Sequence, residues 1–315
     1  MEIRNLGGSG LRVSAVGLGC NNFGQRLDVE GTRKVIHKAL DVGITLFDTA
    51  DVYGNRGGSE TAMGQVLGDR RKDIVLATKF AMQMDDEGVK KGASRRYIMK
   101  AVEDSLKRLQ TDYIDLYQQH AYDPLTPIEE TLRALQDLVS QGKVRYIGCS
   151  NLPAWRVAEA TLTAKAINAT PFVSIQDEYS LVVRDIEKEL QPAAVAYNLG
   201  ILPYFPLASG LLTGKYAGSA DAPAGTRFAN TPRLRDRYVN DRNVGIVEKL
   251  KAFADERGHS MLELAFSWLA SRPQVSSVIA GATRPEQIEQ NAKAIAWKMT
   301  PDDLAEIDRI TRGNG

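Results

Sequence analysis

The amino-acid sequence predicts an α/β fold: a (β/α)8 TIM barrel with an N-terminal β-hairpin and an extra C-terminal helix. Three observations support this prediction. Short β-rich runs alternate with longer amphipathic segments, the runs number eight, and they are almost continuously apolar. Parallel strands covered by helices have this apolar character. A chain of 315 residues fits one barrel, so we expect a single domain over residues 1–315.

Each predicted element follows from its local pattern, and a Gly-rich turn at residues 6–11 predicts the hairpin. The predicted strands are residues 14–18, 45–48, 74–79, 114–118, 144–149, 172–176, 201–205 and 275–279. The predicted helices are residues 31–42, 94–109, 128–141, 154–166, 184–198, 243–257, 284–296 and, at the C-terminus, 300–310.

Other local signals refine this picture. Residues 126–129 and 283–286 both have the spacing of a capping box, with Thr first, Glu fourth and a Pro between them. A doubly wound dinucleotide-binding sheet is disfavoured, because residues 17–24 lack the pattern Gly-x-Gly-x-x-Gly after the first run. Residues 217–241 are predicted to be irregular, as either a binding loop or a disordered insert.

Composition excludes several classes of protein. Lys plus Arg number 40 and Asp plus Glu number 39, so the net charge of +1 provides no general attraction for nucleic acid or an anionic membrane. No transmembrane or signal segment is predicted, and we expect a cytoplasmic protein. Cys20 and Cys149 are expected to be buried thiols, and the three histidines show no metal-binding motif. The sequence carries no signal for an oligomeric state.

Four different titratable side chains lie at or just after the carboxyl ends of neighbouring predicted strands. These are Asp48, Tyr53, Lys79 and His120. Barrel active sites lie at the carboxyl ends of the strands, so we expect these side chains to share one rim. A nearby ammonium group favours the phenolate, so Lys79 is expected to lower the pKa of Tyr53 while Asp48 balances the charge. His120 could then hold a substrate oxygen, and the set suits proton donation to an oxygen that gains negative charge.

Each of these residues also has a purely structural interpretation. Asp48 and Lys79 could form an ion pair without a catalytic role. Tyr53 could pack against a helix, and His120 could be a satisfied polar residue in a loop. The functional interpretation rests on all four occurring at neighbouring strand ends.

The remaining strand ends carry groups suited to a flat ring and a phosphate. Ser150, Asn151 and Gln176 offer neutral hydrogen-bonding groups that could hold an amide, and Tyr204 could stack on a ring. Further along the chain, the small residues Ser209 and Gly210 would let backbone amides approach a phosphate group, and Lys215 follows them in the sequence. The predicted helix after the last strand begins at Arg284, where the helix terminus and the guanidinium both favour an anion.

Five segments of the sequence resemble the aldo-keto reductase family. They are residues 43–54, 115–120, 147–151, 206–216 and 281–291. The resemblance covers nearly the whole chain, and the Leu-Leu-Thr-Gly-Lys-Tyr run is similar to the bacterial branch related to potassium-channel β subunits. It implies a barrel that binds NADP(H) in an extended pose, with NADP(H) favoured over a possible NAD(H).

The resemblance also implies roles for individual residues. Tyr53 would donate the proton in carbonyl reduction, Lys79 and Asp48 would tune its pKa, and His120 would orient the carbonyl group. The implied cofactor-binding residues are Gly19, Cys20, Asp48, Ser150, Asn151, Gln176, Tyr204, Phe205, Leu207, Ser209, Gly210, Leu211, Lys215, Gly281, Thr283, Arg284, Gln287 and Asn291.

Some positions depart from the family pattern. Phe205 follows the stacking tyrosine where many relatives have Ser, and Cys20 stands where Thr is common. Aldose-reductase relatives have Lys and Arg where this chain has Gly281 and Gln287. Arg284 is therefore the obvious cation for an adenosine 2′-phosphate, which leaves NADH use open.

The resemblance leaves two functions open. The first is an enzyme that reduces aldehydes or ketones to alcohols, or oxidises alcohols or sugars in reverse, with a small-molecule substrate. The second is a cofactor-sensing binding subunit with little turnover. Phe23, Phe80 and Tyr122 are predicted to shape the substrate pocket, and Phe23 and Tyr122 could equally be core or rim aromatics.

Overall fold

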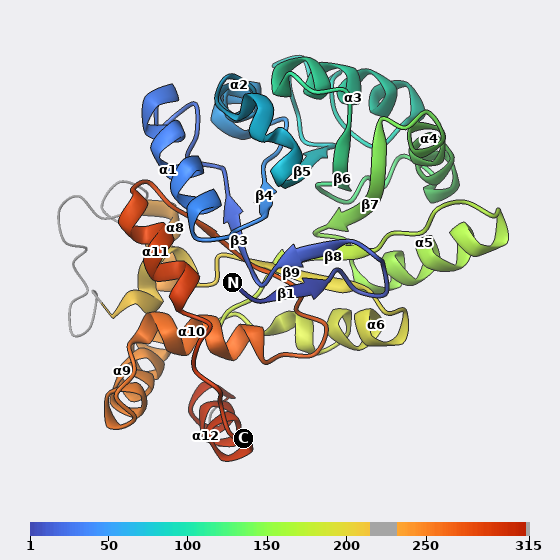
Figure 1. The fold of residues 1–315 in the computed structure, drawn as a ribbon. Helices are drawn as coiled ribbons and strands as arrows, with labels where there is room; N and C mark the ends of the chain where they lie inside the picture. The colour runs from blue at the N-terminus through green and yellow to red at the C-terminus, as the bar shows by residue number, and fades with distance from the viewer. Residues whose placement is uncertain (215–231, 313–315) are drawn as a thin grey trace.

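The computed structural model describes residues 1–214 and 232–312, and its centre is an eight-stranded parallel barrel. The strand order is β10-β3-β4-β5-β6-β7-β8-β9, which is the order of the chain with the last strand beside the first (Figure 1). The barrel strands are β3 (Val16–Gly19), β4 (Leu46–Asp48), β5 (Val75–Phe80), β6 (Ile114–Gln119), β7 (Val144–Ser150), β8 (Ser174–Glu178), β9 (Gly200–Tyr204) and β10 (Val278–Gly281).

The segment just before β10 closes the barrel against β9. The Ile201 amide donates a hydrogen bond of 2.7 Å to the Gln274 carbonyl, and the Ser276 amide donates one of 3.0 Å to the Ile201 carbonyl. The predicted last strand at residues 275–279 therefore begins with this short bridge, and its regular pairing with β3 starts only at Val278. The predicted barrel is confirmed.

The N-terminal hairpin consists of β1 (Ile3–Asn5) and β2 (Arg12–Ser14), which pair antiparallel as predicted. Leu6 and Val13 are fully buried, and they pack with inward-facing apolar side chains of the barrel strands. The hairpin therefore fills the amino-terminal end of the barrel with apolar groups.

Helices surround the barrel (Figure 1). The α-helices are α1 (Val29–Asp41), α2 (Tyr53–Leu67), α3 (Arg95–Leu109), α4 (Ile128–Ser140), α5 (Ala154–Ala166), α6 (Leu190–Ala196), α8 (Pro232–Tyr238), α9 (Asp241–Glu256), α10 (Met261–Ala270), α11 (Pro285–Lys293) and α12 (Pro301–Arg312). Short 3-10 turns occur at η1 (Gly68–Asp73), η2 (Asp185–Glu187) and η3 (Ala208–Thr213). None of the helices in the described residues is long and apolar enough to cross a membrane.

Several predicted helix boundaries were wrong. The predicted helix at residues 184–198 divides into η2 and α6. Pro192 lies in the first turn of α6 and lacks the amide that a helix continuing from η2 would need. Part of the predicted irregular segment 217–241 is helical, since α8 occupies residues 232–238, and residues 217–231 lie outside the described residues. The helices α2 and α10 were not predicted.

Both predicted capping boxes were also wrong. The α4 helix begins after Pro127 without a side-chain cap, and the Thr126 hydroxyl instead donates a 2.7 Å hydrogen bond to Asp123. The α11 helix begins after Arg284 without a side-chain cap. Its Gln287 side chain accepts a 2.8 Å hydrogen bond from the Thr283 amide. In a capping box the residue three positions after Thr283 would accept this bond, whereas Gln287 lies four positions after it.

Two helix glycines provide a test of the packing around the barrel. A Cβ atom at Gly64 in α2 would lie 2.4 Å from the Arg108 carbonyl oxygen at the end of α3, whereas a Cβ at Gly245 in α9 would meet no atom within 4 Å. We expect Gly64→Ala to lower the free energy of unfolding by about 2 kcal/mol, because backbone must move. We expect Gly245→Ala to raise it by about 0.5 kcal/mol through helix propensity.

Urea unfolding of both variants beside the wild-type protein measures these two changes. Changes of the same sign in the two variants would contradict the close packing of α2 on α3.

Candidate active site

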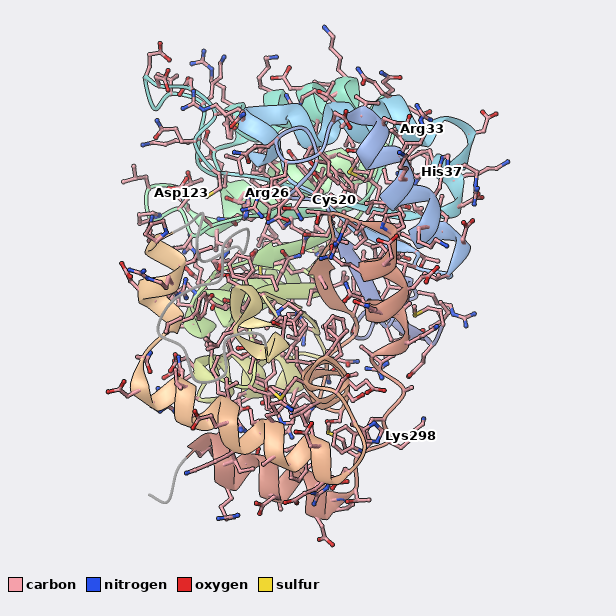
Figure 2. The ribbon with its side chains drawn as sticks, turned by 90° about the vertical axis from the view of Figure 1, so that its left-hand side faces the viewer. Cys20, Arg26, Arg33, His37, Asp123 and Lys298 are labelled. Atoms are coloured by element: carbon pink, nitrogen blue, oxygen red, sulfur yellow. The ribbon has the colours of Figure 1, made fainter. Side chains whose placement is uncertain are left out.

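A cleft of about 790 Å³ lies at the carboxyl ends of the barrel strands. Figure 2 views the molecule from the left-hand side of Figure 1, and Cys20 and Arg26 are labelled in its upper half. The cleft is lined by residues at the ends of β3, β4 and β6–β10 and in the segments that follow them. Parallel strands therefore bring residues that are distant in the sequence to one place.

Lys79 and Asp48 form a buried ion pair at the floor of the cleft. The Lys79 Nζ atom lies 2.7 Å from Asp48 Oδ2 and 2.9 Å from the Thr49 carbonyl oxygen. The two charged side chains are 0% and 4% exposed. Since neither group has water to solvate it, removal of one partner would leave an uncompensated buried charge.

A sharp turn brings Tyr53 to this pair. The Tyr53 hydroxyl lies 3.5 Å from Lys79 Nζ. The turn that follows begins at Gly54, which has a φ of 67°. A Cβ at Gly54 would lie 2.5 Å from the Ser59 amide nitrogen and 2.7 Å from the Phe23 carbonyl oxygen. Only glycine fits there, so this turn fixes where the phenol lies.

The expected lowering of the Tyr53 pKa was wrong as a net effect. Burial raises the pKa of the Tyr53 phenol, and the Lys79 cation only partly offsets this increase. Burial disfavours the Lys79 ammonium, but the Asp48 carboxylate and the Tyr53 hydroxyl together outweigh it and raise the pKa of Lys79 above its ordinary value. At neutral pH the site therefore holds a protonated phenol beside a charged ammonium group.

His120 stands next to the phenol. The rings of His120 and Tyr53 meet edge to face, with centroids 5.6 Å apart. Burial, and then the positive charge of Lys79, lower the pKa of His120 to about 3. Its Nδ1 atom is buried and has no hydrogen-bond partner among the described residues. The imidazole is therefore neutral at physiological pH, with one hydrogen-bonding group unused.

Amide and hydroxyl groups form the adjoining wall. The Asn151 side-chain amide donates to the His120 carbonyl oxygen at 3.0 Å and to Ser150 Oγ at 2.9 Å. The Tyr204 hydroxyl donates to Asn151 Oδ1 at 2.8 Å, and Gln176 Nε2 donates to Asp48 Oδ1 at 2.9 Å. The three predicted amide-holding residues and the predicted stacking residue therefore line one cleft beside the ion pair.

The far end of the cleft suits an anion. Ser209 and Gly210 have positive φ values of 57° and 111° in the turn η3. Arg284 is exposed at the amino terminus of α11, and its guanidinium group has no hydrogen-bond or ion-pair partner within the part of the chain that the structure describes. Backbone amides, a helix terminus and a guanidinium therefore face the same cleft.

Not every predicted site residue lines the cleft. Cys20, Leu211 and Asn291 are buried beside it, and Lys215 lies outside the described residues. The remaining predicted cofactor-binding residues line it, namely Gly19, Asp48, Ser150, Asn151, Gln176, Tyr204, Phe205, Leu207, Ser209, Gly210, Gly281, Thr283, Arg284 and Gln287.

The three aromatics predicted for the substrate pocket do not line this cleft. Phe23 and Phe80 are fully buried, and Phe80 packs against Tyr117 with ring centroids 4.8 Å apart. Tyr122 meets Trp155 edge to face at 5.7 Å outside the cleft lining. Phe23 is therefore a core aromatic, which was the alternative interpretation of its sequence position, and Tyr122 packs against a side chain of α5.

Four polar residues near the carboxyl ends of β3 and β6 were not predicted. Asn21, Asn22 and Arg26 follow β3 and line the cleft. Gln118 is fully buried on β6, and its Nε2 atom lies 3.2 Å from Asp48 Oδ1. Their position close to a predicted strand end was the available signal.

The fold and this site define a TIM barrel with a buried aspartate–lysine pair and an adjoining tyrosine at a cleft formed by the strand ends. A model of the Aldo/keto reductase family matches residues 15–312, and the chain belongs to that family. The resemblance found in the sequence is therefore confirmed. The family and its oxidoreductase members support carbonyl reduction as the general chemistry.

Three relatives are similar over almost their full lengths. The chain is 39% identical to a probable voltage-gated potassium channel subunit beta of Oryza sativa subsp. japonica, over 99% of this chain and 97% of the relative. It is 36% identical to the uncharacterized oxidoreductase YrpG of Bacillus subtilis, over 100% and 97%. It is 34% identical to an L-glyceraldehyde 3-phosphate reductase of Escherichia coli K12, over 98% and 92%.

The buried Asp51 beside this site provides a test of its electrostatics. Burial, and then the Glu60 carboxylate, raise the pKa of Asp51 to about 8. An unfolded aspartate has a pKa of about 3.9. The folded protein therefore keeps a proton that the unfolded chain releases, and stability falls as the pH rises between these values. We expect Asp51→Asn to stabilise the protein by roughly 3 kcal/mol at pH 8 and very little at pH 4.

Urea unfolding between pH 4 and pH 8 checks this expectation. Asp112→Asn, at an exposed position, is the control and should follow the wild-type profile. The expectation fails if the stability gain from Asp51→Asn is the same at every pH.

Proposed function

We propose that this protein is an NADP(H)-dependent oxidoreductase that reduces aldehydes or ketones to alcohols and runs the reverse oxidation. Tyr53 is the proton donor. The proposal rests on one arrangement at the cleft. The Lys79 ammonium nitrogen lies 2.7 Å from a carboxylate oxygen of Asp48 and 3.5 Å from the Tyr53 hydroxyl oxygen. The barrel acts as one domain, and its substrate is a small molecule.

The residues of the cleft fit an extended dinucleotide. Asn151 and Gln176 offer amide groups near the phenol, and the half-buried ring of Tyr204 lies on the same wall. Arg284 and the amino terminus of α11 lie at the other end, where phosphate groups would be held. When bound, the reduced nicotinamide supplies a hydride to the carbonyl carbon of the substrate.

Side chains of the protein supply the proton that the carbonyl oxygen takes up when the carbonyl carbon receives the hydride. As the carbonyl oxygen gains negative charge, Tyr53 transfers its hydroxyl proton to that oxygen, and the alcohol forms. The Lys79 cation stabilises the phenolate that remains, while Asp48 keeps the ammonium group in place. The neutral His120 donates a hydrogen bond to the carbonyl oxygen and orients it. Because burial raises the pKa of Tyr53, the proton stays on the phenol until the substrate oxygen becomes basic.

A second candidate function follows from the names of two relatives. Proteins of Oryza sativa and Arabidopsis thaliana that are 39% and 40% identical are named probable voltage-gated potassium channel subunits beta. The alternative is therefore a cofactor-sensing binding subunit with little turnover.

Replacement of Tyr53 by Phe tests the proposed chemistry. Wild-type protein should oxidise NADPH in the presence of at least one member of a panel of aryl, aliphatic and sugar aldehydes. Tyr53→Phe should bind NADPH with unchanged affinity and lose turnover by at least about 100-fold, because it lacks the proton to donate. Absorbance at 340 nm measures turnover, and NADPH fluorescence measures binding.

Two other outcomes have different meanings. Normal turnover by Tyr53→Phe would reject Tyr53 as the proton donor. Tight NADPH binding by the wild-type protein without turnover on any aldehyde, or on any alcohol with NADP+, would favour the binding subunit instead.

Arg284→Ala tests the cofactor preference. The 2′-phosphate distinguishes NADPH from NADH, so loss of its guanidinium partner should weaken NADPH binding by about 10-fold or more and leave NADH binding nearly unchanged. Lys293→Ala, at the other end of α11 and away from the cleft, is the matched control. Fluorescence titrations with both dinucleotides provide the comparison. An equal loss for both would remove Arg284 from this role.

A further inference from the structure

Gln118 is a buried polar residue to which the proposed chemistry assigns no role. It lies on β6, two residues before His120, and its side chain is fully buried. Its Nε2 atom donates a 3.2 Å hydrogen bond to Asp48 Oδ1, and its Oε1 atom has no partner among the described residues. Within the described part of the chain, the side-chain amide is thus committed to the Asp48 carboxylate.

The two oxygens of Asp48 have different partners. Oδ2 accepts from Lys79 at 2.7 Å. Oδ1 accepts from two glutamine amides, those of Gln176 at 2.9 Å and Gln118 at 3.2 Å. Gln176 lines the cleft, whereas Gln118 does not. A ligand in the cleft can therefore draw the Gln176 side chain away from Asp48, and Gln118 is out of its reach.

The neighbouring strand leaves room for this arrangement. Gly148 on β7 pairs with Gln118 in the sheet register. A Cβ at Gly148 would lie 3.3 Å from Gln118 Cγ and 2.4 Å from Ser174 Oγ. Any larger residue at position 148 would therefore press on the Gln118 side chain.

We propose that Gln118 is a positioning residue for the proposed reaction. Its amide keeps the Asp48 carboxylate turned toward Lys79 when a ligand occupies the cleft and engages Gln176. The inference rests on the proposed function and extends it. Gln118 acts only through Asp48, whose charged and titratable neighbours are Lys79 on β5, Tyr53 on α2 and the Cys20 thiol after β3.

Two substitutions at one position separate positioning from packing. Gln118→Leu keeps a similar volume and removes the donor. Its kcat should fall roughly 10- to 100-fold, the loss of one hydrogen bond to a charged group, while the KM for NADPH stays within about twofold of wild type.

Gln118→Glu should add a new pH dependence to the activity. Below the pKa of the new carboxyl group, its hydroxyl donates to Asp48 and activity should stay near the wild-type level. Above that pKa, two carboxylates face each other and activity should fall, so this variant tests the proposal even if Gln118→Leu folds poorly. The matched control is Gln119→Leu on the same strand, whose amide contacts the Ala121 carbonyl oxygen at 2.9 Å instead of Asp48.

The measurements are kcat and KM between pH 5 and pH 9, the NADPH dissociation constant from fluorescence, and thermal unfolding of each variant. If both Gln118 variants lose thermal stability but keep the wild-type kcat at every pH, this inference is overturned. In that case the wild-type turnover and its loss in Tyr53→Phe would still support the proposed function. Absence of wild-type turnover would overturn both.

Discussion

The ion pair between Lys79 and Asp48 is the constraint on which the rest of the site depends. Two opposite charges lie on adjacent strands, and both are removed from water. Such a pair is stable only when its remaining hydrogen-bonding groups are satisfied. The Thr49 carbonyl oxygen satisfies the ammonium group, and two glutamine amides satisfy the carboxylate. The polar character of this part of the barrel follows from these two charges.

Most of the fold could be predicted because buried parallel strands leave a strong local signal. Each predicted strand overlaps an observed one, although the last begins three residues late because residues 274–276 bond to β9 first. The α2 helix was missed because it begins with a turn that contains Gly54 and other residues of positive φ. The α10 helix has apolar residues around most of its surface, so its sequence lacks the one-sided pattern of an amphipathic helix.

The site was predictable to the extent that strand ends mark it. Asp48, Lys79, Tyr53 and His120 were identified because each lies at or just after the end of a recognisable strand, and the structure brings them together. The net effect on the Tyr53 pKa depends on burial, which is a property of the assembled barrel and not of spacing along the chain. Gln118 was missed for a similar reason, because its partner is 70 residues away in the sequence.

The hairpin at the opposite end of the barrel has an evolutionary consequence. Because Leu6 and Val13 close that end with an apolar plug, the requirements for folding and for ligand recognition are separated along the barrel axis. Mutations among the plug residues alter thermal tolerance, whereas loops at the mouth can diversify without loosening the plug. One scaffold can thus acquire new specificities while selection for folding acts mainly elsewhere.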